Sequence, residues 1–425
     1  MGSFGFTILY IFPRPTDASP FDLERLHTSF RALVEDDYRI LLGELHVDPK
    51  TGVVSVKQTP ETTKPGASRD IPFEKIVVAA NSDDIEGITT DAAMASLSME
   101  FMPKREANQL ATIKATLLSD GGLALGVNMS HTLLDGEGMF TFMKVWGEFY
   151  RSVPKQERTV VYHDRTLLAG KGVGAKLDHP EFKLKAPAPA PAPESAPVPA
   201  PATSVAFPTT TQHVFHISPA QMKQIKQVTM SSLEDGYVST IDALTALFII
   251  LISQARGHSQ SVRVTTGVNA RKRFSPPLPE NYVGNVIFNA FSKYEAHELE
   301  ALSTESIGNI AKRVRQSILQ RDDTFLRDAI EFVASKDNLS DVLVGTNFFL
   351  GPDLMFTSWV NFGMYDADFG SRPWYAGVPK LPLIDGMIVF MEGIKGSDGL
   401  DLVVLLETQA LQRLVALWGQ VPFWN

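Results

Sequence analysis

The sequence predicts a two-lobed protein of mixed α-helices and β-strands. Its 425 residues are two or three times a typical domain length. A run of alternating alanine and proline at residues 186–202 divides the chain into halves of similar size. Stretches with strand periodicity alternate with helical ones in each half, as in α/β folds. We therefore expect one lobe over 1–185, a linker over 186–204 and a second lobe over 205–425.

The first half alternates strands and helices. Residues 4–12 are apolar and end at prolines, which indicates a first strand. Ser19-Pro20 is typical of a helix start, and apolar residues follow at helical spacing from Leu23 to Val34. Residues 122–130 alternate as a strand with one apolar face, and helical spacing resumes over 140–149. The intervening residues form a strand-to-helix junction, where loops commonly carry chemistry.

The linker cannot form a helix or a central strand, because seven of its residues are proline. Such a segment favours extended polyproline II, on the order of 50 Å long when fully stretched. We interpret it as a passive spacer. The other interpretation, a ligand for a proline-recognising domain, lacks a clear anchoring pattern.

The second half repeats the same alternation. Ser218-Pro219 begins a helix, and Ser239 or Thr240 begins a strongly apolar one that must be buried. A strand near Val262 and a long amphipathic helix follow. The chain then has two apolar strands, near 387–391 and 402–406, and a last helix with leucines at 411, 414 and 417.

Composition excludes several classes of protein. The 39 basic and 48 acidic residues give a formal net charge of −9, the opposite of a general nucleic-acid or anionic-membrane binder. The chain has no cysteine, which excludes disulfides, thiolate metal sites and a cysteine nucleophile. His213 and His216 form the only close histidine pair and face opposite sides of a predicted strand, so we expect no metal. No apolar run could span a membrane, and we expect a cytoplasmic protein.

The segment His131-Thr-Leu-Leu-Asp135-Gly136 is the clearest candidate for chemistry. Walker A, G-x-S-x-G and H-E-x-x-H signatures are all absent from the sequence. Taken alone, the segment could be a polar turn whose histidine is satisfied by hydrogen bonds. However, His131 ends a strand just before a helix with a buried face, so it can project into a groove between the lobes. A histidine there is largely neutral near pH 7 and available as a base.

This segment and several later ones, in the same order, resemble the BAHD family of CoA-dependent acyltransferases. The matching features are the HxxxDG signature at 131–136, the helix beginning Ser239-Thr-Ile-Asp, the arginine motif Asn269-Ala-Arg271-Lys-Arg273, the Pro276–Asn285 turn, Thr357-Ser358-Trp359 and Asp368-Phe369-Gly370. Ser371 and Arg372 stand where the family has Trp and Gly, a departure that affects local packing more than catalysis. The chain looks more like fungal members, such as the trichothecene 3-O-acetyltransferases, than like plant members.

The resemblance implies a chloramphenicol-acetyltransferase-like fold, in which each lobe is a mixed sheet flanked by helices and the active-site channel runs between them. His131 would then be the general base and would later protonate the CoA thiolate. Asp135 would point away and pair with an arginine, either Arg271 or Arg273. Gly136 would permit the turn, and Asp368 would make a comparable structural contact.

Other site residues are also implied by the resemblance. Trp359 would donate to the oxyanion, since an indole N–H is a rigid donor, and Thr357 would orient the acceptor or the oxyanion. Trp359 could instead be a plain core tryptophan. Ser239 would bind the nucleotide end of CoA, and the candidate cations for its phosphates are Lys223, Lys226, Lys272 and Arg372. No metal is implied.

The expected reaction is transfer of an acyl group from acyl-CoA to a hydroxylated small molecule. Acetyl-CoA is the first choice of donor, and Phe348-Phe349, Met364 and Tyr375 favour an apolar acceptor. Two alternatives stay open: a non-catalytic acyltransferase-like binding protein, and N-acylation of an amine. Nucleic acid and membrane are not expected as partners, and a monomer is the family default.

Overall fold

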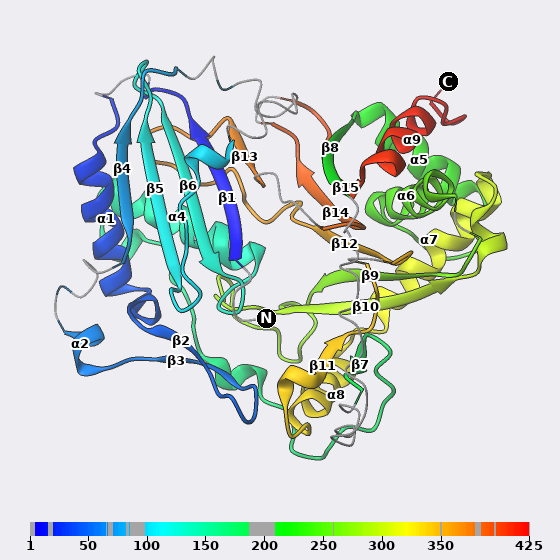
Figure 1. The fold of residues 1–425 in the computed structure, drawn as a ribbon, viewed down its shortest axis with the longest axis horizontal. Helices are drawn as coiled ribbons and strands as arrows, with labels where there is room; N and C mark the ends of the chain where they lie inside the picture. Colours follow the sequence, from blue (N-terminus) through cyan, green and yellow to red (C-terminus); the bar gives the residue numbers. More distant parts are fainter. Residues whose placement is uncertain are drawn as a thin grey trace, which may run out of the picture.

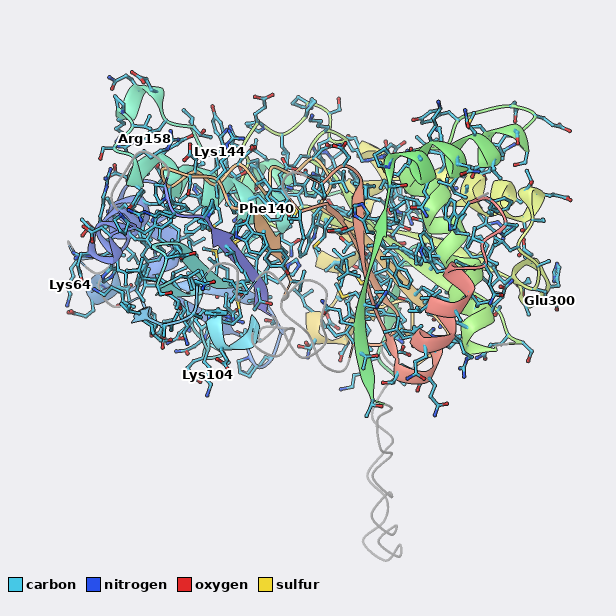
Figure 2. All side chains as sticks on the ribbon, turned by 90° about the horizontal axis from the view of Figure 1, so that it is seen from above. Lys64, Lys104, Phe140, Lys144, Arg158 and Glu300 are labelled. Atoms are coloured by element: carbon cyan, nitrogen blue, oxygen red, sulfur yellow. The ribbon has the colours of Figure 1, made fainter. Side chains whose placement is uncertain are left out.

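The computed structural model describes residues 5–15, 20–64, 66, 71–81, 85, 98–186, 209–257, 259–348, 351–378, 384–394 and 397–424. Most of the predicted linker, residues 187–204, therefore lies outside the described residues. The described chain forms two lobes side by side, each a β-sheet with helices packed on it (Figure 1). In Figure 2, Lys64 lies at the outer end of the first lobe, Lys104 on its lower side, and Glu300 at the far end of the second lobe.

The first lobe is built on a five-stranded sheet. Helices α1 (Leu23–Asp36) and α4 (Gly136–Tyr150) pack on one face and share its apolar core. The leucines, valine and methionine predicted to form one face of β6 all lie in that core, as expected. In order across the sheet, the strands are β13 (Tyr375–Gly377), β1 (Gly5–Phe12), β6 (Leu123–Ser130), β5 (Ala111–Leu117) and β4 (Phe73–Val77).

One helix start was predicted in the wrong place. Helix α1 begins at Leu23, not at Ser19-Pro20, because Asp22 is its N-cap. The Asp22 carboxylate accepts hydrogen bonds from the backbone N–H groups of Glu24 and Arg25, at 2.8 and 3.2 Å. An aspartate caps a helix as well as a serine does.

The second lobe is built on a six-stranded sheet. Helix α6 (Thr240–Arg256) is buried nearly all round, and α5 (Pro219–Ser231), α7 (Thr304–Leu319) and α9 (Thr408–Trp418) surround it (Figure 1). Ser218 and Ser239 each form a capping box, so both predicted helix starts are confirmed. In order, the strands are β10 (Ile287–Tyr294), β9 (Val262–Asn269), β12 (Leu354–Ser358), β14 (Met387–Glu392), β15 (Leu400–Glu407) and β8 (Thr210–Ile217).

Smaller elements complete the described fold. Two further two-stranded antiparallel sheets are present: β2 (Glu44–Val47) pairs with β3 (Val54–Lys57), which is close in sequence, and β7 (Phe182–Leu184) pairs with the distant β11 (Val342–Val344). The remaining elements are α2 (Pro60–Thr63), α8 (Asp323–Ala334) and the 3₁₀ helices Arg39–Leu42, Ser98–Phe101, Lys155–Glu157, Arg165–Leu168, Ala296–Leu299 and Leu339–Asp341. No helix in the described ranges is long and apolar enough to cross a membrane.

A segment from the second half of the chain completes the first lobe. Strand β13 pairs antiparallel with β1, with Leu9 opposite Gly377. Trp359, Met364 and Phe369 belong to the first lobe's apolar core. The sequence pattern assigned all of 205–425 to the second lobe and did not predict this crossover, which ties the two lobes together.

Replacing Gly147 by alanine tests how closely this crossing segment packs. A Cβ at Gly147 would lie 2.4 Å from the backbone oxygen of Asp368, which cannot move aside as a flexible side chain could. We expect Gly147→Ala to lower the free energy of unfolding by about 1–3 kcal/mol, the usual cost of overpacking. Urea denaturation measures this. The matched control is Gly419→Ala, because Gly419 has a φ of −66° and an added Cβ there would lie 3.7 Å from the backbone oxygen of Ala416, an ordinary contact.

Candidate active site

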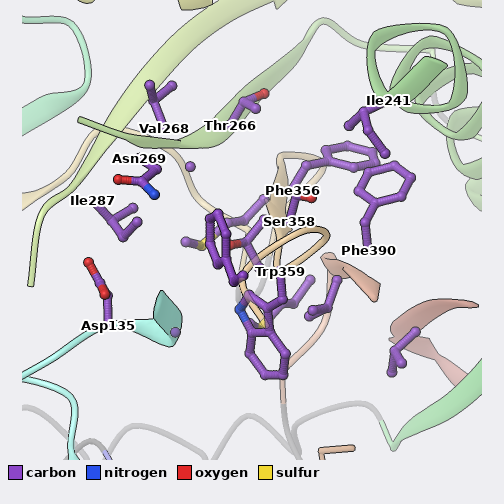
Figure 3. Close-up of a pocket in the computed structure, with 18 of the residues that line it drawn as sticks. Asp135, Ile241, Thr266, Val268, Asn269, Ile287, Phe356, Ser358, Trp359 and Phe390 are labelled. Carbon is purple, nitrogen blue, oxygen red and sulfur yellow. The ribbon is translucent and has the colours of Figure 1, made fainter. Parts of the chain in front are cut away.

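A cavity of about 620 Å³ lies where the two lobes meet. Gly5, Phe6 and His131 of the first lobe line it together with β9, β12, β14 and β15 of the second. Figure 3 shows Ser358, the last residue of β12, and Trp359 directly after it in the middle of the cavity, with Asp135 and Asn269 to one side and Ile241 and Phe390 to the other. A ligand in this cavity would therefore contact both lobes.

His131 lies at the predicted strand-to-helix junction, directly after β6 and before α4. Its half-buried ring contacts the ring of Phe6 edge-on, with centroids 5.4 Å apart. The side chain amide of Asn285 donates to its backbone oxygen at 2.8 Å. His131 thus sits on the cavity wall, held by residues of both lobes.

Asp135 forms a buried ion pair with Arg271. Nη1 and Nη2 of Arg271 each donate to one carboxylate oxygen at 2.9 Å. The carboxylate also accepts from the backbone N–H groups of Gly138, at 3.0 Å, and Val286, at 2.8 Å. These four bonds fix Asp135 as the N-cap of α4 and as a link between lobes.

The structure decides between the two candidate arginines. Arg273 does not contact Asp135; its Nη1 donates to the backbone oxygens of Ile318 and Arg321, at 3.0 and 3.3 Å. Arg273 instead lines the cavity, as does Arg315. Burial, and after it the charge of Arg315, lowers the pKa of Arg273 from its ordinary value. Two guanidinium groups therefore share one end of the cavity.

Trp359 and Gly136 are packed against each other. A Cβ at Gly136 would lie 3.2 Å from Cδ1 and 3.3 Å from Nε1 of the indole, so glycine allows this approach. The indole lies 5.0 Å from the ring of Phe6 and 5.8 Å from that of Phe140, between centroids. Trp359 is both part of the core and part of the cavity wall, and Thr357 lines the same wall.

The cavity reaches both faces of the six-stranded sheet. Thr357 pairs with Val389, and Val389 with Val403, so their side chains share the face toward the first lobe. We name this part the apolar chamber, lined by Met355, Thr357, Met387, Val389, Val403 and Leu405. On the opposite side, toward α6 and α7, the cavity is lined by Ser239, Asp242, Arg273 and Arg315 together with the apolar Ile241, Phe356 and Phe390. We name this part the polar chamber for its charged groups.

Of the predicted CoA-binding residues, only Ser239 lines the cavity. Lys223 and Lys272 are exposed outside it, and the Lys226 ammonium lies 3.8 Å from the ring centroid of Tyr237. Arg372 is exposed and lies 3.6 Å from a carboxylate oxygen of Asp366. None of these four cations lines the cavity: Lys223, Lys272 and Arg372 are exposed, whereas Nζ of Lys226 is buried against Tyr237. Charge alone does not reveal from the sequence which way such a side chain faces.

The altered DFG segment is accommodated by local contacts. A carboxylate oxygen of Asp368 lies 3.6 Å from Nη1 of Arg151, and its backbone oxygen accepts from Nε of that arginine at 3.1 Å. The Ser371 hydroxyl donates to the backbone oxygen of Pro13 at 2.9 Å. Asp368 thus makes the kind of structural contact expected of it, and Ser371 joins this segment to the end of β1.

Several cavity residues were not predicted from the sequence as site residues: Phe6, Asn269, Asn285 and Arg315. Asn269 belongs to the arginine motif and Asn285 to the Pro276–Asn285 turn. These motifs indicated the region of the site but not the role of these two side chains. The side chain amide of Asn269 donates to the carboxylate of Glu137. Oε2 of Glu137 lies 3.7 Å from Nη1 of Arg271. Phe6 and Arg315 belong to an ordinary strand and helix and carry no local signal.

Among acceptor-favouring residues, Phe348 lines the cavity, whereas Met364 and Tyr375 do not. Phe349 lies outside the described residues. No group of three or more His, Asp or Glu side chains arranged to hold a metal occurs in the described part of the chain. His216 instead contacts Asp401, at 2.8 Å between Nδ1 and a carboxylate oxygen.

Comparison with known proteins identifies the family. The profile described as the Transferase family matches residues 7–416, nearly the whole chain. The chain belongs to this family, the BAHD acyltransferases. It is therefore a CoA-dependent acyltransferase, as the sequence motifs implied.

Relatives of this BAHD acyltransferase share the fold at low identity. The structure of F. sporotrichioides TRI101 complexed with coenzyme A and T-2 aligns with a TM-score of 0.76 at 17% identity, covering 98% of this chain and 95% of that one. Vinorine synthase aligns with a TM-score of 0.67 at 18% identity, covering 98% and 90%. Hydroxycinnamoyltransferase 1 of Oryza sativa subsp. japonica is 26% identical over 316 residues, 73% of this chain and 69% of that one. The predicted chloramphenicol-acetyltransferase-like fold is thus confirmed.

Proposed function

We propose that this BAHD enzyme transfers an acyl group from acyl-CoA to a hydroxyl of a small, apolar acceptor, with His131 as general base and without a covalent acyl-enzyme. The observation that supports this most is the position of His131 on a cavity that has a polar and an apolar chamber. A phosphate-bearing donor and an uncharged acceptor need opposite environments, and this cavity offers both.

The polar chamber suits the CoA side. Arg273 and Arg315 are the cations that line the cavity among the described residues. Arg315 is paired with the buried Asp242, whereas the bonds of Arg273 go only to neutral backbone oxygens. Guanidinium groups bind phosphate well, and Ser239 adds a hydroxyl at the start of α6. The presence of these groups supports entry of CoA from this side of the cavity. The similar TRI101 structure contains bound coenzyme A.

The apolar chamber suits the acceptor. Its walls are methionine, valine and leucine side chains together with Thr357, and Phe348 lies nearby in the same cavity. Burial of an apolar molecule here would be favourable by about 25 cal/mol per Å² of apolar area removed from water. The TRI101 structures are described as complexes with coenzyme A and T-2 or deoxynivalenol, which agrees with a second, small-molecule ligand beside CoA.

The chemistry balances without an enzyme-bound intermediate. The acceptor oxygen attacks the thioester carbon while an imidazole nitrogen of His131 takes the hydroxyl proton. The C–O bond forms, the C–S bond breaks, and the proton passes to the leaving thiolate to give free CoA. The indole N–H of Trp359, with Thr357 beside it, would stabilise the oxyanion before the C–S bond breaks. Every group named in this proposal belongs to one chain.

Release of free thiol from acyl-CoA tests the proposal. The chain has no cysteine and adds no thiol background. We expect release from acetyl-CoA only when an apolar alcohol is present. Parallel arms use hydroxycinnamoyl-CoA, because several relatives are named for that group, and amine acceptors. Acceptor-dependent release with amines alone would favour N-acylation, and CoA thioesters that stabilise the fold without turnover would favour a binding protein.

Replacing Arg273 by alanine separates the two chambers. Loss of a charge-assisted phosphate contact costs about 1.5–3 kcal/mol, so we expect the KM for acyl-CoA to rise about 10- to 100-fold. The KM for the acceptor should stay within about twofold. Steady-state kinetics with each substrate varied in turn measures both values. Arg372→Ala, on the exposed surface outside the cavity, is the matched control and should change neither value.

A further inference from the structure

The catalytic loop after β6 is held by a strip from the other lobe, residues 282–286. The backbone N–H of Asp135 donates to the oxygen of Gly284 at 3.2 Å, and Arg271 donates to the same oxygen at 3.0 Å. Arg165 bridges the two segments by donating to the backbone oxygens of Val283 and Leu133. These bonds hold the backbone of the loop but do not touch the side chain of His131.

Asn285 is the residue of this strip whose side chain contacts His131. Its Nδ2 donates to the backbone oxygen of His131 at 2.8 Å and lies 3.4 Å from the ring atom Nδ1. The carbonyl oxygen can only accept, so the amide nitrogen, and not the amide oxygen, must face His131. The exposed Asn285 side chain also lines the cavity.

We propose that Asn285 is a positioning residue for His131. One atom, Nδ2, contacts both the main chain and the ring of the same histidine. The orientation of the ring relative to its backbone is therefore set from the opposite lobe. Phe6 contacts the ring from β1, so the imidazole lies between a polar contact from one lobe and an aromatic contact from the other. A base must keep its angle to the reacting hydroxyl, since a misplacement of about 1 Å can cost about 100-fold in rate.

The Asn285→Ala variant tests whether Asn285 positions the ring of His131. This test rests on the proposed function, in which His131 is the general base. We expect kcat to fall about 10- to 100-fold, because the ring loses a contact that fixes its angle. The KM values for acyl-CoA and acceptor should stay within about twofold, since Asn285 is assigned no substrate contact. The matched control is Asn289→Ala on β10, which neither lines the cavity nor contacts His131 and should keep wild-type kcat.

The Asn285→Asp variant adds a measurement that a merely structural residue would not move. The carboxylate cannot donate to the His131 oxygen, and its negative charge beside Nδ1 favours the protonated ring. We expect the acid limb of kcat/KM against pH to move to higher pH. An unchanged limb with unchanged kcat in both variants would overturn the proposal, as would a rise in KM with kcat intact, which would indicate substrate contact instead.

A readout without turnover keeps this proposal separate from the proposed function. Nitrogen NMR of histidine-labelled protein follows the His131 ring, whose signals are those lost in His131→Gln. We expect its titration to shift to higher pH in Asn285→Asp and to stay in place in Asn289→Ala. If the wild-type enzyme released no CoA with any acceptor, this shift would still support positioning. If the His131 titration did not shift in folded, active Asn285→Asp protein, the proposal that Asn285 positions His131 would be refuted.

Discussion

Replacement of His131 by alanine is expected to lower kcat/KM by about 10²–10⁴-fold, the usual contribution of a general base. The imidazole is half-buried on the cavity wall, and its ring contacts include those with Phe6 and Asn285. No other histidine lines the cavity among the described residues, so none there can take over the proton. Initial rates of CoA release at fixed, sub-saturating substrate measure the loss.

The control for this prediction is stability. His131 lies in a turn outside the apolar core, so the thermal midpoint should change little. His131→Gln keeps a polar side chain of similar reach and should be as inactive as the alanine variant. Activity within tenfold of wild type in both variants would remove His131 from its role as base. Loss of activity accompanied by unfolding would show only that the turn needs histidine to fold.

Breaking the Asp135–Arg271 pair is expected to be the most destabilising single change in the site. The side chains of Asp135 and Arg271 are 1% and 4% exposed. Without Arg271 the Asp135 carboxylate would be a buried, unpaired charge, and without Asp135 the buried guanidinium would keep only Glu137, 3.7 Å from its Nη1. Removing one member of such a pair typically costs about 3–5 kcal/mol. Asp135→Asn removes the charge at constant shape, and Arg271→Met removes it with a similar apolar stem. Urea unfolding of each variant measures the loss of free energy.

The double variant Asp135→Asn, Arg271→Met provides the comparison. With both charges gone, the loss should be smaller than the sum of the single losses, because neither charge is stranded. The measurement also separates two roles for Asp135. If the carboxylate relayed charge to His131, Asp135→Asn would reduce kcat at unchanged stability. The bidentate contact with Arg271 predicts instead that the main effect of Asp135→Asn is a lower free energy of unfolding.

Much of the fold could be predicted because its long elements carry strong periodicity. The buried face of β6 and the core positions of α1 and α7 are visible as spaced apolar residues. Strand β13, with three residues, is too short to show a period, and its partner strand is far away in sequence: Leu9 and Gly377, which face each other, are 368 positions apart. The crossover could therefore be seen only in three dimensions.

The candidate site was predicted unevenly for a physical reason. Local backbone features, such as the strand-to-helix turn at His131 and the helix cap at Ser239, can be predicted from the neighbouring sequence. The choice of Arg271 over Arg273 does not, because residues two apart in a turn differ in direction only once the turn is folded. The cations proposed for CoA were chosen by charge alone, and the cavity is instead lined by Arg273 and by Arg315, whose partner lies on another helix.

Strand β13 also constrains how this protein can be made. The edge of β1 is covered only after residues near Gly377 have been synthesised. During translation of most of the chain, the first sheet therefore has an unpaired edge. Long-range pairing of this kind slows folding and leaves the unfinished sheet exposed to other chains. The first half expressed alone would keep that edge open permanently, and chaperone supply during expression matters more for this enzyme than its two-lobed outline suggests.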